Sequence, residues 1–236
     1  MKVQLLYLLL AATLAPLCYG WLLKEASSTP LAASGDSCNC DGTIYGEKDP
    51  ELYICGDERL GPINWPNKLP LRSFVTDYNR FGGLTPGEFL EKWIQREGRY
   101  EGKYLYPGDF GFSLDITGTP MNRTMVLEVG SLVDRFGDES GKYLSAADAP
   151  FSQRSLPPSS LNTNSANPGY PHQYHIYRVI KSLILTGGPI APWFGQPGLG
   201  TQFHTAAIGD ITTLKAKGYL EEVDPSVLIS NSRGCA

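Results

Sequence analysis

A loop rich in glycine and proline, from Pro192 to Gln202, constrains the fold of this chain more than any other segment. Three glycines allow its backbone to approach a ligand closely, and two glutamines offer uncharged hydrogen-bonding groups. Its glycine spacing and the two prolines, Pro192 and Pro197, disfavour the strand, tight turn and helix of a dinucleotide-binding fingerprint. No Gly-Lys-Ser or Gly-Lys-Thr follows, so it is not a Walker phosphate loop. Alone, this glycine loop fits either a ligand pocket or a surface turn.

The first 20 residues predict a secretory signal peptide. Met1 and Lys2 precede an apolar run from Val3 to about Leu17, and small residues allow cleavage after Gly20. The run is too short for a convincing membrane span, so we expect a secreted chain without a transmembrane segment. The rest of the 236 residues suffices for one ordinary core and a small second one.

Four cysteines follow the predicted signal: Cys38, Cys40, Cys55 and Cys235. An even number in an oxidising compartment predicts two disulfides. We expect Cys38 and Cys40 to pair outward with Cys55 and Cys235 rather than with each other, and the pairing itself stays open. Such a bridge would tie the C-terminus to the N-terminal segment. The spacing does not match a zinc site.

Charge and one short motif narrow the partners and the surface. The formal net charge is −4 and no basic patch stands out, which argues against nucleic acid as a partner. Asn122-Arg123-Thr124 is an N-glycosylation sequon, which predicts that Asn122 is exposed and glycosylated.

The first half of the mature chain divides by composition. Residues 21–61, rich in Ser, Ala, Gly and Asp, indicate an extended arm held by disulfides. Residues 62–124 form an aromatic-rich section with one well-marked helix. Thr85 is the expected N-cap, Glu88 completes a capping box, and Gly98 is the expected stop.

The second half mixes short strands with separate helices. Met125–Val129 and Tyr174–Ile180 are predicted strands, and the segment from Leu156 to Tyr170 is a predicted loop. A last helix is expected from Asp210 to Gly218. This arrangement favours an α+β fold over alternating βαβ units.

The standard hydrolytic motifs are incomplete in this sequence. The segment Gly111–Asp115 starts like a nucleophile elbow but lacks its closing glycine. His172 and His175 lie in or beside a predicted strand with no third metal ligand in view.

A series of short motifs remains, in a fixed order along the chain. These are Asp134–Gly137, Tyr143-Leu144, Pro150–Pro158, Tyr174–Tyr177 and the glycine loop. Together they resemble the TNT domain, named for the tuberculosis necrotizing toxin, and more closely its secreted fungal relatives, the conidial surface NAD glycohydrolases. The resemblance covers Met125 to about Val223, so we assign a TNT-like domain to residues 125–236.

The resemblance implies a small, mostly antiparallel twisted sheet with a few helices. It also implies cleavage of the nicotinamide–ribose bond of NAD, with NADP as a second candidate substrate, to nicotinamide and ADP-ribose. The leaving group is a cationic pyridinium that departs as neutral nicotinamide, so neither a strong acid nor a cofactor is required for the chemistry. The site must instead hold the pyrophosphate and stabilise an oxocarbenium-like state while water attacks.

The resemblance also assigns roles to individual residues. Arg135 and Arg154 suit the pyrophosphate, because a guanidinium can bind phosphate oxygens in a fork. Tyr143 matches a site position of the bacterial members, and His175 does so less clearly. Substrate-binding candidates are Phe136, Trp193 and Phe194, which could stack on a base, together with Gly198, Gly200 and Thr201. The family's catalytic glutamine is either Gln196 or Gln202, and the sequence leaves that choice open.

Further properties are expected from the resemblance or from composition. Glu221, Glu222 and Asp224 form an acidic group that could hold a structural calcium ion, or else form a solvated turn. A homodimer is expected by resemblance, and no immunity or inhibitor protein can be identified. The alternatives are an ADP-ribosyl cyclase or transferase on the same scaffold, and a non-catalytic secreted surface effector.

Overall fold

The computed structural model describes residues 39–43, 49–99 and 101–230. The predicted signal peptide, most of the predicted arm, Cys38 and Cys235 lie outside the described residues. Within the described ranges, no helix has the length and apolar character needed to cross a membrane.

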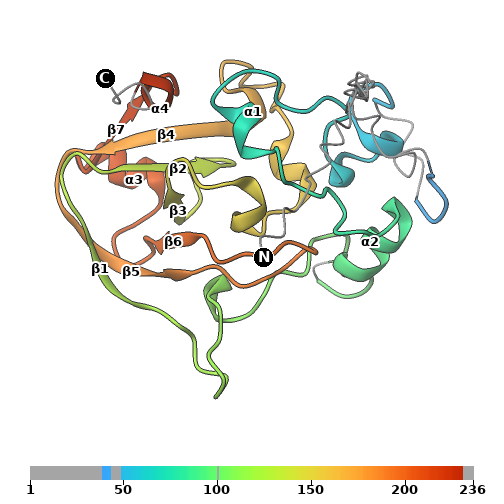
Figure 1. The fold of residues 1–236 in the computed structure, drawn as a ribbon, viewed down its shortest axis with the longest axis horizontal. Coiled ribbons are helices and arrows are strands. Elements are labelled where there is room, and N and C mark those ends of the chain that lie inside the picture. The colour runs from blue at the N-terminus through green and yellow to red at the C-terminus, as the bar shows by residue number, and fades with distance from the viewer. Residues whose placement is uncertain (1–38, 44–48, 100, 231–236) are drawn as a thin grey trace, which may run out of the picture. The chain divides into compact units, whose positions relative to one another are not determined.

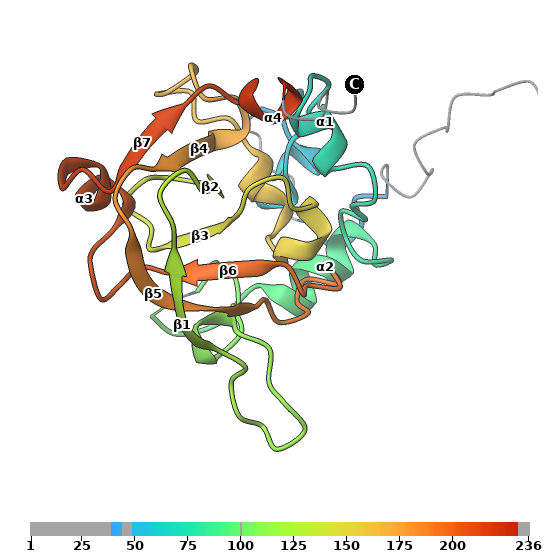
Figure 2. The ribbon, with the colours of Figure 1, turned by 60° about the vertical axis from the view of Figure 1, so that its left-hand side comes forward.

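One antiparallel sheet of seven strands organises the described residues. Its spatial order is β1-β5-β6-β3-β2-β4-β7, and every neighbouring pair is antiparallel. The strands are β1 (Arg123–Leu127), β2 (Leu132–Phe136), β3 (Tyr143–Ala146), β4 (Tyr174–Val179), β5 (Leu183–Pro189), β6 (Thr201–His204) and β7 (Leu220–Val223). Figure 2 shows that the sheet curls, so its edge strands β1 and β7 both bend round toward the same side. The expected α+β class and antiparallel sheet are confirmed.

Four short α-helices and several 3₁₀ turns accompany the sheet. The helices are α1 (Leu71–Phe74), α2 (Pro86–Trp93), α3 (Ile211–Ala216) and α4 (Val227–Ser230). The 3₁₀ turns are η2 (Ile54–Gly56), η3 (Glu58–Leu60), η4 (Asp109–Gly111), η5 (Phe151–Arg154), η6 (Pro158–Leu161) and η7 (Pro171–Gln173). These lie outside the sheet, as Figure 1 shows for the labelled helices.

The two predicted helix starts are confirmed by their caps. In α2 the Glu88 amide donates to Thr85 Oγ1, and the Thr85 amide donates to the Glu88 carboxylate at 2.8 Å. In α3 the Thr213 amide donates to Asp210 Oδ1 at 2.8 Å. Helix α2 ends at Trp93 rather than near Gly98, because Ile94 is already extended and forms a bridge with Tyr104.

Apolar side chains form three buried clusters. Two pack on the sheet, one around Tyr177 and Leu183 and the other around Phe136 and Phe151. The third joins the N-terminal section to the glycine loop. It contains Leu60, Phe81, Phe89, Leu90, Ile94 and Phe194. The glycine loop is therefore packed against the N-terminal section.

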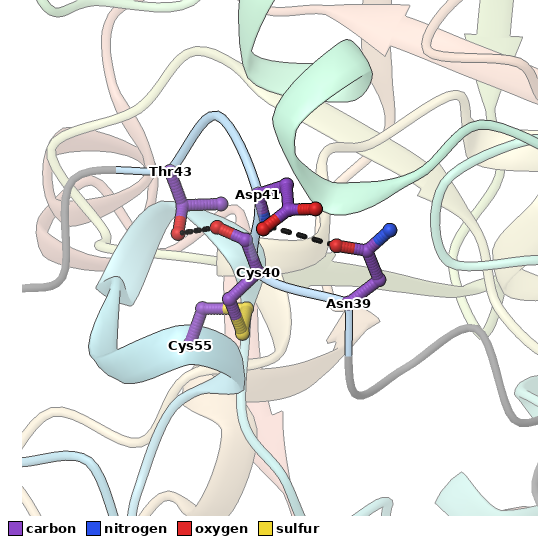
Figure 3. Close-up of a disulfide and its surroundings, with 5 residues drawn as sticks. All are labelled: Asn39, Cys40, Asp41, Thr43 and Cys55. Atoms are coloured by element: carbon purple, nitrogen blue, oxygen red, sulfur yellow. Dashed lines mark hydrogen bonds between the residues drawn. A yellow bond between two sulfur atoms is a disulfide. The ribbon is translucent and has the colours of Figure 1, made fainter.

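A disulfide joins Cys40 to Cys55 with a Cα–Cα distance of 5.6 Å (Figure 3). This agrees with the expectation that Cys40 pairs outward rather than with Cys38. Residues 49–61 were expected to be extended, but they form η2 and η3 and bury Leu60. This part of the predicted arm is thus a packed segment.

Candidate active site

A pocket of about 460 Å³ opens where β2, β3 and β6 meet residues 106–111 and the turn after η5. It is the place where the predicted site residues gather. Five of them line it: Arg135, Phe136, Tyr143, Arg154 and Gln202. The strand order explains this gathering, because β2, β3 and β6 are consecutive neighbours in the sheet.

Arg135 brings an unbalanced positive charge to this pocket. Its Nε donates to the Asp138 carbonyl at 2.7 Å and its Nη1 to the Tyr143 carbonyl at 3.0 Å. Among the described residues, no carboxylate lies within ion-pair distance of its guanidinium. Burial lowers the pKa of the Arg135 guanidinium below its ordinary value. A partly desolvated cation without a carboxylate partner is suited to bind an anionic ligand.

Arg154 has a different environment. Its guanidinium donates to both carboxylate oxygens of Asp134 and to the Ala149 carbonyl, and the ion pair is buried. Tyr174 also donates its hydroxyl proton to Asp134 at 2.9 Å. The charge of Arg154 is therefore matched within the protein, and the side chain anchors η5 to β2. That geometry leaves little of the guanidinium for the phosphate expected from the sequence.

Gln202 lies in the pocket with its amide held in place. It pairs with Ser145 across β3 and β6, and its Nε2 donates to the Phe110 carbonyl at 3.0 Å. The donor side of the amide is thus fixed, and among the described residues no group donates to Oε1. Gly111 approaches the same amide closely, since a Cβ there would lie 3.4 Å from Nε2. Gln202 therefore presents an acceptor oxygen from a rigid strand.

Gln196, the other candidate, does not line this pocket. Its side chain is buried, and its Nε2 donates to the carbonyls of Asn79 and Phe194. These bonds tie the glycine loop to the turn around residue 79. The geometry thus separates two glutamines that the sequence could not distinguish.

The rest of the glycine loop supports the fold behind the pocket. Phe194 is completely buried in the third cluster, and Trp193 packs on Trp93 while donating to the Leu105 carbonyl at 2.6 Å. Gly198 and Gly200 are needed for close backbone packing, because a Cβ on either would lie less than 3 Å from another part of the chain. None of these residues, nor Thr201, lines the pocket. Phe194 is therefore a core residue, whereas Trp193 and Thr201 are half-buried and lie away from this pocket.

Phe136 lines the pocket but is also a core residue. It is 6% exposed and packs edge-on against Phe151, with ring centroids 5.0 Å apart. Little of its ring face is left for a base.

Three aromatic rings stack beside the pocket, and the sequence analysis missed two of them, Phe110 and His204. His204 lies between Phe110 and Tyr143, with ring centroids 4.7 Å and 4.8 Å away and interplanar angles of 28° and 20°. Burial, followed by the charge of Lys142, lowers the pKa of His204. A sequence signal for His204 was available, because alternate side chains along a strand point to the same face of a sheet. This puts Gln202 and His204 on one face of β6 and Phe203 on the other.

His175 lies elsewhere, in a cluster of charged side chains. Its Nδ1 is 2.8 Å from Glu222 Oε1, and its ring stacks on Tyr170. Glu139, His175 and Glu222 are close enough together to hold a metal ion, but Lys215 Nζ already bonds both carboxylates, at 2.8 Å and 2.7 Å. An ammonium group at that point does not fit a cation site.

The three acidic residues expected to hold calcium do not converge. Glu221 and Glu222 are adjacent on β7 and so point to opposite faces of the sheet; Glu221 is 3.7 Å from Arg178. Asp224 accepts the Ser226 amide in a local turn. These three residues therefore do not form a ready cation site among the described residues, and calcium binding stays a prediction.

Comparison with known proteins decides the family. The family model described as tuberculosis necrotizing toxin (TNT) matches residues 126–223. A curated relative, the conidial surface nicotinamide adenine dinucleotide glycohydrolase nadA of Aspergillus fumigatus, is 46% identical over 176 residues, or 75% of this chain and 73% of the relative.

This chain belongs to the TNT family. Among solved structures, the tuberculosis necrotizing toxin in complex with its immunity factor IFT aligns with a TM-score of 0.49 and 19% identity, over 64% of this chain and 80% of that chain. Tse6 in complex with Tsi6 aligns with a TM-score of 0.30 and 19% identity, over 44% of this chain and 72% of that one. The TNT match spans the end of β1 and all of β2 to β7, but not residues 106–111, which form part of the pocket. In this TNT-family chain, the pocket is thus completed from outside the matched region.

Proposed function

We propose that this protein is an NAD glycohydrolase, which hydrolyses the bond between nicotinamide and ribose. The proposal rests on the family and the named relative, and on one observation about the pocket. That observation is a cation, Arg135, which has no carboxylate partner in the described ranges and faces the same pocket as a fixed neutral amide, Gln202. These groups suit a substrate with an anionic pyrophosphate and a reacting centre that needs no acid.

The chemistry requires little proton transfer. The C–N bond breaks with its electron pair moving to the pyridinium nitrogen, which leaves as neutral nicotinamide. Water then adds to the ribose carbon and releases one proton, giving ADP-ribose. A neutral acceptor such as Gln202 Oε1 is suited to orient this water or a ribose hydroxyl without pairing permanently with Arg135.

The stacked rings provide the apolar surface. Phe110 and Tyr143 are partly exposed at the pocket, with His204 between them. We propose that this edge contacts a flat base of the dinucleotide. The family resemblance assigns Tyr143 to the site, and the geometry adds Phe110 and His204.

Secretion and surface location complete the proposal. The signal-like first 20 residues and the relative's description as a conidial surface protein both favour an extracellular enzyme. Asn122 is exposed, as glycosylation requires. Homodimer formation stays a proposal that a sizing measurement on the purified protein can test.

The direct test is product analysis with purified secreted protein. We expect equimolar nicotinamide and ADP-ribose from NAD, and a parallel assay with NADP measures the preference between them. Cyclic ADP-ribose or labelled protein as the main product would favour the cyclase or transferase instead. A folded protein that releases no nicotinamide from either dinucleotide would contradict the proposal.

A further inference from the structure

A buried serine hydroxyl on the pocket wall has no hydrogen-bond partner among the described residues. Ser155 directly follows η5, is 6% exposed, and lines the same pocket as Arg135 and Gln202. Within the described part of the chain, its Oγ is one of three buried side-chain polar atoms without a partner, and the other two residues do not line this pocket. Buried hydroxyls are nearly always bonded, because leaving one unbonded costs free energy.

The backbone at Ser155 adds a second unfavourable feature. Its φ and ψ of 47° and 42° lie in the left-handed region, which favours glycine over residues with a side chain. Glycine would remove both the strain and the unbonded hydroxyl. Serine here therefore weakens the fold in two ways, and the fold alone does not explain it.

The surrounding contacts hold this hydroxyl in place. Arg154, the preceding residue, is anchored to Asp134 of β2 by a buried ion pair. The Gln153 carbonyl accepts the Gly200 amide at 3.0 Å, two residues before Gln202. Ser155 is thus held between β2 and the start of β6, facing the pocket.

We propose that Ser155 is a substrate-binding residue whose hydroxyl hydrogen-bonds a ribose hydroxyl in the ADP-ribose part of the dinucleotide. This inference rests on the proposed function. A serine hydroxyl both donates and accepts, as does a ribose hydroxyl, whereas phosphate oxygens only accept and already have Arg135 available. The bound substrate supplies the partner that the protein does not.

Removing the hydroxyl oxygen of Ser155 tests this inference. In Ser155→Ala we expect a Tm equal to or above that of the wild type, because no protein hydrogen bond is lost, and Ser155→Gly should gain further from relief of the backbone strain. The KM for NAD should rise by roughly tenfold in both variants, the value of one good hydrogen bond.

A second buried serine, Ser113, is a control that distinguishes an effect on substrate binding from an effect on stability. Ser113 is also buried, but its Oγ donates to the Ile190 carbonyl at 2.9 Å and it does not line this pocket. Ser113→Ala should therefore lower the Tm and leave the KM unchanged, the reverse of Ser155→Ala.

Calorimetric binding of the two products identifies the part of the substrate that is contacted. Ser155→Ala should bind ADP-ribose roughly tenfold more weakly than the wild type, with nicotinamide affinity unchanged. A higher Tm with unchanged KM and unchanged ADP-ribose affinity would overturn the inference, as would a loss confined to nicotinamide. If the wild type binds ADP-ribose but releases no nicotinamide, the proposed function fails while the assignment of Ser155 survives.

Discussion

At the scale of single residues, the two pocket arginines differ in how their charges are balanced. Arg154 is paired with Asp134, whereas Arg135 is held, within the part of the chain that the structure describes, by backbone carbonyls. Gly141 makes room for Arg135, because a Cβ at that position would overlap the guanidinium. An adjacent small residue thus sets the position of the cation, and Gly141 becomes a positioning residue.

We therefore expect Gly141→Ala to move Arg135 and weaken substrate binding. The KM for NAD should rise by about tenfold, while stability changes by less than about 1 kcal/mol, because the overlapped atoms end a flexible side chain. Steady-state kinetics and thermal melting check this. The control is Gly169→Ala, where a Cβ meets nothing within 4 Å. Equal KM values in both variants would show that the position of Arg135 does not matter for binding.

At the scale of elements, the glycine loop and the turn at residues 79–84 support each other. Gln196 bonds the Asn79 carbonyl, and a Cβ on Gly82 would lie 2.5 Å from Gly195 Cα. Phe194 is buried among side chains of the N-terminal section. The loop thus positions β6, and with it Gln202, by packing against a distant part of the chain.

This packing predicts a large effect of Gly82→Ala. Overlap with Gly195 and a φ of +62° should together destabilise the fold by about 2 to 4 kcal/mol. Chemical denaturation measures this directly. Gly83→Ala is the matched control, since its φ of +86° is also positive but a Cβ there meets nothing within 4 Å. Similar losses of stability in the two variants would mean that backbone strain at positive φ, and not overlap with Gly195, causes most of the destabilisation.

A network between α3, β4 and β7 makes stability depend on acid pH. Lys215 Nζ bonds Glu222 at 2.7 Å, and His175 contacts the same carboxylate; Glu139, Tyr170 and Tyr177 also face this network. Burial alone would raise the pKa of Glu222, but the bonds from Lys215 and His175 outweigh it and lower that pKa below 4.5. Because the pKa of Glu222 is lower in the folded state, its charged carboxylate stabilises the fold at pH values above the unfolded pKa of about 4.5. This stabilisation is lost as the pH falls through the folded pKa.

Glu222→Gln should therefore melt below the wild type at pH 7. Below about pH 4.5 the difference should shrink, because the wild-type carboxyl becomes protonated as well. Melting curves across this range give the answer. A difference that stays constant with pH would mean that the charge of Glu222 contributes nothing.

The sequence predicted the elements whose signals are local. The caps of α2 and α3 depend on side chains within three residues, and β4 is a continuous β-branched and aromatic run. Strands β3 and β6 have only four residues each and are defined by their pairing, which has no local signal. The same limit applies to the site. The choice between Gln196 and Gln202 depends on the register of β6, and the burial of Phe194 depends on residues more than 100 positions away.

At the scale of the whole described chain, the N-terminal section completes the pocket. Residues 106–111 lie outside the matched TNT region, yet Phe110 holds the Gln202 amide and stacks on His204. The disulfide between Cys40 and Cys55 closes a 15-residue separation at the start of this section. It constrains the section without touching the pocket.

Replacing both Cys40 and Cys55 by alanine should lower stability by about 3 kcal/mol, the entropy expected for a loop of this length. The KM for NAD should stay within about twofold of the wild type at temperatures where the variant is folded, because neither cysteine lines the pocket. Denaturation and kinetics on the same preparation measure both quantities. A raised KM in a fully folded variant would show that the disulfide also controls the pocket.

The most direct test of the account is nicotinamide release from NAD by Gln202→Ala, compared with Gln153→Ala. Gln153 is an exposed glutamine on η5 that does not line the pocket. We predict that Gln202→Ala loses activity on the order of 100-fold or more with its fold intact, while Gln153→Ala keeps wild-type activity. Wild-type release of nicotinamide by a folded Gln202→Ala would contradict the assignment of this pocket as the active site.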